Sequence, residues 1–322
     1  MKKNNEIPHG VMFHYFHLKK PFQGSISQEQ FKEVLDYIGS ENLLSAEEWT
    51  KRAETNKLEK NNLCITFDDG LRCQYETGLP VLRKYGLTAF WFVNSNTFVG
   101  ELGFLEIYRH FRNTCFTTID EFYGAFYFTA LSSSFASAVQ QGLNVFPRNY
   151  LSEYPFYTEG DRKFRYIRDK ILKASEYDQI MNKMINSKGL IFQDLSKELW
   201  LGTEHLQALQ SKGHIIGLHS HSHPTVMANL PYDTQQLEYQ KNFDIFSKIL
   251  SEKPFTMAHP SGSYSDDTLK ILRDLGIRLG FRANMLQKKY SRLELPREDV
   301  AVLLRAKQGA EKKDIGKKLG KR

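Results

Sequence analysis

Residues 63–93 read LCITFDDGLRCQYETGLPVLRKYGLTAFWFV, and this stretch decides the fold class. The segments LCITF and LTAFWFV are short apolar runs, as expected for strands that are buried on both faces. Between them, TGLPVLRKYG has the pattern of a helix that ends at Gly86. A strand, a helix and a second strand joined by short links predict parallel strands with a crossover helix.

The same alternation continues on both sides of this stretch. An apolar strand at 11–13 precedes two amphipathic helices, for which Ser27 and Ser45 are the expected N-cap residues. A further helix is expected to begin at the N-cap Thr203. Later strands are expected in HIIGLHS, FTMAHPSG and IRLGFRAN. SDDTLKILRDLG is expected to be a helix whose N-cap is its serine or its first aspartate. LELPREDVAVLL is the last segment of the series. The pattern predicts an α/β domain.

The alternation stops between about residues 98 and 200, where the chain becomes helical and aromatic. Residues 98–166 hold 18 Phe and Tyr in 69 positions, against an aromatic content of 13% for the whole chain. DEFYGAFYFTAL and RKFRYIRDKILKASEYDQIMNKMI have the periodicity of amphipathic helices. We predict an insertion whose aromatic residues form a core, with a sugar-stacking wall or a partner surface as the alternative.

The net charge of +7 is concentrated at the C-terminal end. Residues 305–322 hold eight Lys and Arg against two Asp and Glu, whereas the rest of the chain has 36 against 35. This stretch predicts a basic, flexible tail, with peripheral contact to an anionic membrane surface as the alternative. The nearly neutral remainder argues against a nucleic-acid partner.

The N-terminal segment and the cysteines predict a cytoplasmic location. MKKNNEIPHGVMFHYFHLKK lacks the apolar run of a secretory signal, and no segment approaches the roughly 18 apolar residues of a membrane span. Cys64, Cys73 and Cys115 are odd in number and form no CxxC pair, which is typical of free thiols in a reducing compartment.

Two polar clusters stand where predicted strands end. ITFDDG places the carboxylates of Asp68 and Asp69 side by side, and such neighbours repel unless water or a cation separates them. HSHSHP places His219 and His223 at the end of another strand. Carboxyl ends of parallel strands meet at one edge of a sheet, and two imidazoles with one carboxylate bind a metal while leaving positions open. We predict a metal site there, although a histidine cluster alone is also compatible with a solvated loop.

TFDDG at 66–70 and HSHSHP at 219–224 resemble the first two motifs of the NodB-type polysaccharide deacetylases, carbohydrate esterase family 4. The resemblance covers roughly 8–95 and 203–300. It implies an α/β fold, a distorted (β/α) barrel with the helical, aromatic-rich stretch as an insertion, and metal-dependent hydrolysis of N- or O-acetyl groups on sugars. On this basis we expect a single NodB-like domain over residues 1–304.

By position, the resemblance assigns Asp69, His219 and His223 to the metal and makes Asp68 the catalytic base. His14, in VMFH, fits a circularly permuted branch that resembles the biofilm poly-N-acetylglucosamine deacetylases. It would be the general acid that protonates the leaving amine, with a core or surface histidine as the alternative. One divalent metal is expected, Zn²⁺ by default, and Co²⁺, Ni²⁺ or Mn²⁺ would also suit these ligands.

The later motifs depart from the family pattern. The third is usually Arg-x-Pro-x-Gly, but AHPSG puts Ala258 where the family has the arginine that orients the base. Arg282 or Arg297 would have to reach in from another strand, and His259 lies in the same loop. We predict these last three as substrate-site residues, and we expect His221 to lie behind the metal ligands or to be exposed.

The resemblance therefore predicts a metal-dependent N-deacetylase of an acetylated sugar or an intracellular glycan precursor, in the assembly of a surface polysaccharide. One alternative is a metal hydrolase of another amide or ester. A second is a degenerate scaffold that binds carbohydrate without catalysis. The missing arginine favours the degenerate scaffold, whereas the complete set of Asp68, Asp69, His219 and His223 opposes it.

Overall fold

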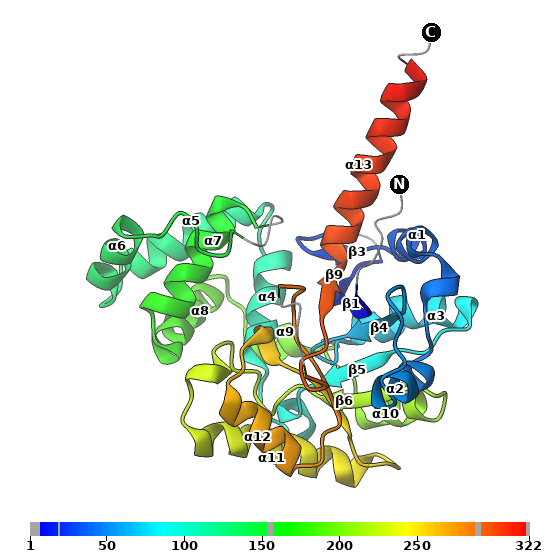
Figure 1. The fold of residues 1–322 in the computed structure, drawn as a ribbon. Helices are drawn as coiled ribbons and strands as arrows, with labels where there is room; N and C mark the ends of the chain where they lie inside the picture. The colour runs from blue at the N-terminus through cyan, green and yellow to red at the C-terminus, as the bar shows by residue number, and fades with distance from the viewer. Residues whose placement is uncertain (1–6, 19, 153–156, 287–290, 320–322) are drawn as a thin grey trace. The chain divides into compact units, whose positions relative to one another are not determined.

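The chain divides into two units in a computed structural model, which describes residues 7–18, 20–152, 157–286 and 291–319. The first unit comprises Met1–Leu102 and Trp200–Arg322, and the second comprises Gly103–Leu199. The second unit falls in the stretch that the sequence predicts as an insertion, and Figure 1 shows it in cyan and green.

Parallel strands form the centre of the first unit. They are β1 (His9–Phe13), β4 (Leu63–Phe67), β5 (Phe90–Val93), β6 (Ile215–Leu218), β7 (Thr256–Ala258), β8 (Leu279–Phe281) and β9 (Arg297–Asp299). Among the described residues they make a seven-stranded sheet in the order β8-β7-β6-β5-β4-β1-β9. Every neighbouring pair is parallel, so the carboxyl ends of these strands lie at one edge.

The two outer strands of this sheet are joined by the segment that precedes β9, so the sheet nearly closes. Leu295 pairs in parallel with Phe281 of β8. The Leu295 N–H donates to the Gly280 carbonyl at 2.8 Å, and the Arg282 N–H donates to the Leu295 carbonyl at 3.0 Å. This closure confirms the predicted distorted (β/α) barrel.

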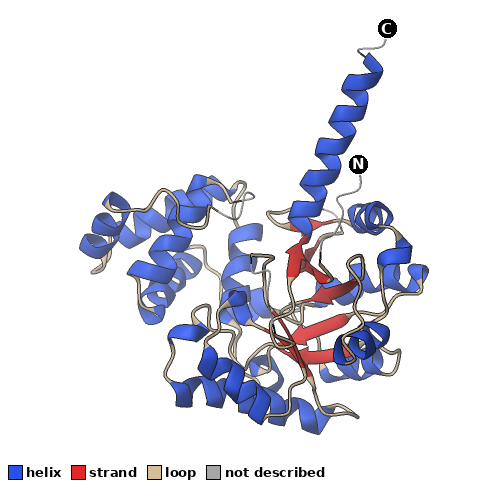
Figure 2. Cartoon of the chain, viewed as in Figure 1, coloured by secondary structure: helices blue, strands red, loops and turns tan. Residues whose placement is uncertain are grey.

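Helices cover the outside of the barrel (Figure 2). They include α1 (Gln28–Ile38), α2 (Ala46–Glu54), α3 (Leu79–Tyr85), α10 (Thr203–Gln210), α11 (Tyr232–Ile249) and α12 (Asp266–Asp274). The predicted caps at Ser27, Ser45 and Ser265 are confirmed, because each side chain accepts a backbone N–H three residues on. The prediction for Thr203 is wrong by one residue. Gly202 is the N-cap, since its N–H donates to Nδ1 of His205 at 2.9 Å.

Strands β4 and β5 are buried along their whole length. The rings of Phe67 and Trp91, on these two strands, lie 4.4 Å apart between centroids. The ring of Phe13 at the end of β1 packs edge-on against Phe31 of α1 at 4.6 Å. Burial on both faces explains why these strands read as continuous apolar runs in the sequence.

The second unit is helical. Its helices are α4 (Phe104–Thr114), α5 (Ile119–Leu131), α6 (Ala136–Asn144), α7 (Glu159–Tyr166), α8 (Ala174–Ser187) and α9 (Phe192–Ser196). The helical pattern predicted through RKFRYIRDKILKASEYDQIMNKMI is found with one interruption: α7 continues as a π-helical turn (Ile167–Ile171), the chain is extended at Leu172, and α8 then begins at Ala174. The aromatic core is confirmed in part: Phe164 packs on Phe122 and Phe126 at 5.3 and 5.0 Å.

Two further features complete the first unit. β2 (Tyr15–Phe16) and β3 (Ser25–Ile26) form a small separate sheet. α13 (Val300–Leu319) follows β9, so most of the stretch predicted as a flexible tail lies within a helix. In the described part of the chain, no helix combines the length and the apolar character needed to cross a bilayer.

Candidate active site

Polar side chains from three strands meet at the carboxyl edge of the barrel. His14 follows β1, Asp68 and Asp69 follow β4, and His219 follows β6. Nε2 of His14 lies 3.8 Å from Oδ2 of Asp68, and Nε2 of His219 lies 4.0 Å from the same oxygen. The parallel sheet therefore assembles residues that are far apart in sequence.

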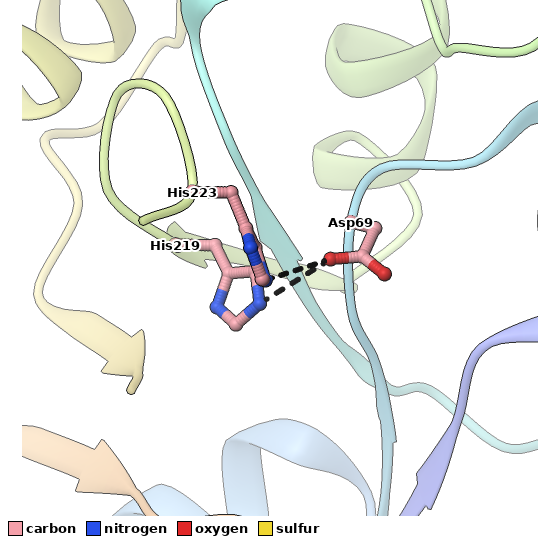
Figure 3. A group of neighbouring side chains, drawn as sticks. All are labelled: Asp69, His219 and His223. Atoms are coloured by element: carbon pink, nitrogen blue, oxygen red, sulfur yellow. Dashed lines mark ion pairs between the residues drawn. The ribbon is translucent and has the colours of Figure 1, made fainter. Parts of the chain in front are cut away.

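Asp69, His219 and His223 direct their polar atoms at one another (Figure 3). Oδ1 of Asp69 lies 3.5 Å from Nε2 of His219 and 3.3 Å from Nε2 of His223. One ligand atom from each residue lies within 4.8 Å of the other two. The structure thus brings together the three residues that the sequence assigns to a metal.

The turns that carry this cluster have positive φ angles. Asp69 and Gly70 have φ of 74° and 64°, and Ser220 and His223 have φ of 61° and 58°. Residues other than glycine adopt this region only where their surroundings hold them there. The His223 N–H donates to Oγ of Ser220 at 3.1 Å, which fixes one turn. A Cβ on Gly70 would lie 2.6 Å from Cγ1 of Val93. The other turn therefore needs glycine at this position for two reasons, the positive φ angle and the lack of space for a side chain.

The backbone around His219 fixes its tautomer. Its Nδ1 lies 2.8 Å from the Ala258 carbonyl, which can only accept, so Nδ1 carries the proton and Nε2 presents a lone pair toward Asp69. The His219 N–H donates to Oδ1 of Asn242 at 2.9 Å. Burial alone would lower the pKa of His219, but Asp68 and Asp69 outweigh burial and raise it.

These residues fit a divalent transition metal. Two imidazoles and one carboxylate converge, and the hydrogen bond from Nδ1 of His219 leaves its other nitrogen free to act as a ligand. The raised pKa of His219 means that the surrounding carboxylates favour a positive charge at this point. A cation would supply that charge in place of the proton, and this ligand set suits zinc, cobalt, nickel or manganese.

Arg297 lies against Asp68 inside the barrel. Its Nη1 donates to Oδ1 at 2.6 Å and its Nη2 donates to Oδ2 at 2.8 Å. Burial alone would raise the pKa of Asp68, but Arg297, together with His219 and His14, lowers it overall. The carboxylate is therefore held ionised in a fixed orientation, and each of its oxygens keeps a lone pair for another donor.

Gln74 fastens the backbones of His14 and Asp68 together. Its Nε2 donates to the His14 carbonyl at 2.8 Å and to the Asp68 carbonyl at 2.6 Å. Gln74 is wholly buried and begins a π-helical turn (Gln74–Gly78) five residues after Asp69. The side chain of His14 is 26% exposed, so it reaches both Asp68 and solvent.

His221, between the two histidines of the cluster, is bound elsewhere. Its Nδ1 lies 3.0 Å from Oγ of Ser95, and its Nε2 lies 3.0 Å from Oε2 of Glu101. The Asn96 N–H also donates to the His221 carbonyl at 3.0 Å. His221 was expected either behind the metal ligands or exposed, and it is buried. Its hydrogen bonds connect the loop that carries the histidines to the segment after β5.

His259 and Arg282 lie behind the site. His259 is buried, its Nε2 lies 2.8 Å from the Leu293 carbonyl, and burial lowers its pKa to about 4. Arg282 is buried and its Nε donates to the Asn284 carbonyl at 3.0 Å. The Arg282 carbonyl accepts a hydrogen bond from Nε of Arg297 at 2.8 Å, which helps to hold the arginine on Asp68.

Sequence reasoning missed Gln74 and Asn242. Both are wholly buried amides, and Asn242 joins strands by accepting from the His219 N–H and donating to the Val93 carbonyl at 3.2 Å. A polar residue on an amphipathic helix has no sequence signal that distinguishes a buried amide from a solvated one. Their contacts appear only when the barrel is assembled.

Comparison with known proteins agrees with this architecture. The family model described as polysaccharide deacetylase matches residues 55–110 and 175–280, which is half of the chain. The matched stretches contain both ITFDDG and HSHSHP. No curated protein matches the chain by sequence.

Several solved structures share the fold. The Streptococcus pyogenes deacetylase PplD, in complex with acetate, is 17% identical with a TM-score of 0.54 over 91% of each chain. IcaB from Ammonifex degensii is 15% identical with a TM-score of 0.51 over 90% of each chain. The BpsB deacetylase domain from Bordetella bronchiseptica is 12% identical with a TM-score of 0.51, over 90% of this chain and 95% of that chain. At these identities the similarity concerns the fold.

Proposed function

Because this chain belongs to the polysaccharide deacetylase family, we propose that it is a metal-dependent hydrolase that removes acetyl groups from N-acetylated sugars or glycan precursors. One observation carries the proposal. The cluster of Asp69, His219 and His223 lies beside the buried ion pair of Asp68 and Arg297, with His14 at 3.8 Å from Asp68. This geometry supports a proposed cation site, base and acid around one point at the carboxyl edge of the barrel.

In this proposal, Asp69, His219 and His223 hold one divalent cation, with zinc as the first choice and cobalt, nickel and manganese as alternatives. When bound there, the cation supplies Lewis-acid polarisation of the acetyl carbonyl and lowers the pKa of a neighbouring water. The turns at Asp69 and His223, both with positive φ angles, would set the positions of the ligand atoms.

Asp68 is the proposed general base. Arg297 keeps it ionised and holds its plane, so a lone pair is available to take a proton from the attacking water. A backbone N–H in the loop after Asp69 would donate to the acetyl oxygen as negative charge develops on it. The buried surroundings of Asp68 strengthen these interactions relative to bulk water.

His14 is the proposed general acid. As the C–N bond breaks, Nε2 would donate a proton to the amine nitrogen of the sugar. Its partial exposure allows contact with the substrate, and Gln74 sets its position relative to Asp68. The placement of β1 between β4 and β9 supports the permuted arrangement, in which the strand that bears the acid comes first.

We also propose that the reaction takes place in the cytoplasm, on a nucleotide-linked, lipid-linked or other intracellular glycan precursor. The three cysteines, Cys64, Cys73 and Cys115, support a reducing compartment because they are odd in number and form no CxxC pair. The basic C-terminal stretch would suit peripheral contact with an anionic membrane.

Acetate release tests the proposal. The protein, loaded in turn with each of the four metals, is incubated with N-acetylglucosamine oligomers, O-acetylated sugars and acetamides that are not sugars. We expect metal-dependent acetate release from the N-acetylated sugars, and its loss in Asp68→Asn. Binding of the oligomers without turnover, unchanged in Asp68→Asn, would instead indicate a carbohydrate-binding scaffold. Release from acetamides alone would indicate another amide hydrolase.

A further inference from the structure

Asn94 follows β5, the strand between the two strands whose ends carry the proposed metal ligands. In the sheet, β5 has β4 with the Asp pair on one side and β6 with His219 on the other. The last residue of β5, Val93, pairs with Leu218 at the end of β6. The His219 N–H donates to the Val93 carbonyl at 3.2 Å, so Asn94 and His219, which follow the two strands, are neighbours at the carboxyl edge. A Cβ on Gly70 would lie 2.6 Å from Cγ1 of Val93, so the turn after the Asp pair also lies against this strand end.

The alternation of side chains along β5 turns Asn94 toward the inside of the barrel. The rings of Phe90 and Phe92 lie 5.2 and 5.4 Å from the ring of Phe281 on β8. Because β8 is not a neighbour of β5 in the sheet, these contacts cross the barrel interior. The guanidinium of Arg297, which binds the proposed base, lies 5.7 Å from the ring of Phe92. Every second residue of a strand points to the same face, so Asn94 points inward, one layer nearer the carboxyl edge than Phe92.

Hydrogen bonds to the backbone fix which end of the Asn94 amide is the oxygen. Oδ1 of Asn96 accepts from the Thr97 N–H at 3.0 Å, and its Nδ2 donates to the Leu102 carbonyl at 3.3 Å. These two partners leave one orientation for the Asn96 amide, so the group that donates to its Oδ1 at 2.8 Å is Nδ2 of Asn94. Oδ1 of Asn94 is therefore on the side of the amide away from Asn96.

Oδ1 of Asn94 is a buried acceptor without a hydrogen-bond partner in the described part of the chain, and the residue is only 5% exposed. An unpaired buried acceptor costs free energy, and a ligand that brings a donor recovers it. The neighbouring polar groups have other tasks in the proposed reaction. Asp68 takes the proton of the water, Asp69 holds the cation, and His14 is a donor when it acts as the acid. Asn94 is thus an acceptor that the proposed mechanism leaves unused.

We propose that Oδ1 of Asn94 accepts a hydrogen bond from the N–H of the acetamido group and so selects N-acetylated over O-acetylated sugars. An acetyl ester has nearly the same shape, but its oxygen cannot donate and would leave Oδ1 unpaired. A site that hydrogen-bonds a substrate N–H rejects the analogue without it far more strongly than a site that senses size alone. The inference rests on the function proposed above and deepens it, because it assigns the choice between amide and ester to one residue.

The order of the strands suits this role. β4, which carries Asp68, lies between β1 and β5, so His14 and Asn94 come from strands on opposite sides of the proposed base. An N–H held by Asn94 fixes the orientation of the amide nitrogen, so that its lone pair is directed away from Asn94 as the C–N bond breaks. The proton passes from Nε2 of His14 to this lone pair, and none passes to Asn94.

Binding to the variant Asp68→Asn tests the inference without turnover. Two probes are titrated by calorimetry into the zinc-loaded protein: an N-acetylglucosamine oligomer, and a glucose oligomer of the same length and linkage that carries its acetyl groups on the 2-hydroxyls. We expect the N-acetylated oligomer to bind about tenfold or more tightly than the ester. In Asp68→Asn/Asn94→Leu we expect the two affinities to agree within about twofold, because no acceptor is left unpaired.

Ser95→Ala, made in the same Asp68→Asn background, is the matched control. Ser95 is the next residue, it is wholly buried, and its Oγ lies 3.0 Å from Nδ1 of His221, so this variant should keep the preference for the amide. Metal content by mass spectrometry is the second measurement. Asn94→Leu should retain the metal content of the wild type, because the proposed partner of Asn94 is the substrate. Loss of the metal from this variant would overturn the proposal, since Asn94 would then act on the cation.

The outcomes separate this inference from the proposed function. A preference for the amide that Asn94→Leu removes, in a protein whose wild type releases no acetate, would support the inference and reject catalysis. Equal binding of the two oligomers by Asp68→Asn would overturn the inference even if the wild type releases acetate. That comparison needs no variant of Asn94, so it holds if Asn94→Leu does not fold. A preference that survives in Asn94→Leu, or absence of binding by either oligomer, would also overturn the inference.

Discussion

Arg297 contacts both carboxylate oxygens of Asp68 from 229 residues further along the chain. In the family pattern an arginine of the third motif orients the base, whereas this chain has Ala258 there, at the end of β7. Arg297 enters from β9, on the other side of the barrel closure. An arginine partner for Asp68 is therefore supplied by a different strand, so the alanine at position 258 does not leave this carboxylate without an arginine.

Removing Arg297 should disable Asp68 as the proposed general base. In Arg297→Met, Asp68 keeps its burial but loses its bidentate partner, so we expect kcat/KM for acetate release to fall about 100-fold through misplacement of the carboxylate. The uncompensated buried charge should also lower the free energy of unfolding by about 3–5 kcal/mol. Steady-state kinetics and urea unfolding check both expectations.

The double variant Asp68→Asn/Arg297→Leu separates the two effects. It removes the buried carboxylate charge as well as the guanidinium, so we expect it to regain part of the lost stability while it stays inactive. Wild-type kcat/KM in Arg297→Met would show that Asp68 needs no arginine.

Metal content should distinguish the histidines of HSHSHP. His219→Ala and His223→Ala each lose one of three proposed ligands, so we expect about one transition metal per chain in the wild type and little in either variant. His221→Gln is the control from the same loop, because both ring nitrogens of His221 are bound by Ser95 and Glu101. It should retain the metal. Mass spectrometry on protein purified without chelator measures all four, and loss of metal only from His221→Gln would contradict the assignment.

His14→Ala should affect the chemical step alone. Loss of a general acid typically lowers the rate 10²–10⁴-fold, so we expect kcat to fall by about that factor while metal content stays the same. His17→Ala is a matched control, since His17 follows β2 directly and its Nδ1 is paired with Oγ of Ser25 in β3 at 2.8 Å. Discontinuous assays of acetate release measure kcat for both variants and the wild type. Each is assayed with one substrate whose amine is a good leaving group and one whose amine is a poor leaving group. Equal activity of His14→Ala and His17→Ala would exclude His14 as the acid.

Acid should destabilise the barrel through His214. Burial lowers the pKa of His214 to about 4, and its Nδ1 accepts from the Ala89 N–H at 3.0 Å and from Nε1 of Trp91 at 3.3 Å. The unfolded chain, with a histidine pKa of about 6.5, takes up this proton more readily. The contribution of neutral His214 to the free energy of unfolding is therefore complete above about pH 6.5. It is lost as the pH falls toward 4, and the loss amounts to at most about 3 kcal/mol.

His214→Asn measures this contribution. The amide oxygen can accept the same two hydrogen bonds but does not titrate, so the free energy of unfolding should fall less between pH 7.5 and pH 5 than in the wild type. His259, whose pKa burial also lowers to about 4, should retain part of the pH dependence in this variant. Urea unfolding measures this change at both pH values. If the free energy of unfolding falls by the same amount between pH 7.5 and pH 5 in the variant and in the wild type, His214 is not a source of the pH dependence.

The alternation of strands and helices predicted an α/β fold, and the resemblance to the deacetylase family supplied the barrel. β4, β5 and β6 are buried apolar runs that end directly in polar residues, and both the strand and the turn chemistry are local. The candidate metal ligands could be named for the same reason. In the helical unit, local pattern was insufficient. The amphipathic period continues through Leu172, and only the bond from the Lys173 N–H to Glu176 at 2.8 Å marks the new helix start.

The partner of the base could not be chosen from sequence. Arg282 and Arg297 both stand near strand ends, and the choice depends on how the segment before β9 pairs with β8 and how β9 pairs with β1. The register places Arg297 opposite Gly10, where a glycine leaves room for its side chain: a Cβ at Gly10 would lie 3.1 Å from Cγ of Arg297. Such long-range pairings have no local signature.

The position of β1 has a consequence for synthesis of the chain. Of the strands in this sheet, β1 is synthesised before the others and β9 after the others, so one edge of β1 can pair with β4 while its other edge still lacks its partner β9. Until then the nascent protein carries an unpaired strand edge, the kind of template on which other chains aggregate. Translation that stops short of residue 297 would leave this edge open and the base without its arginine. Pairing of β9 with β1 would thus cover the exposed edge and, in the same step, bring Arg297 to the proposed base.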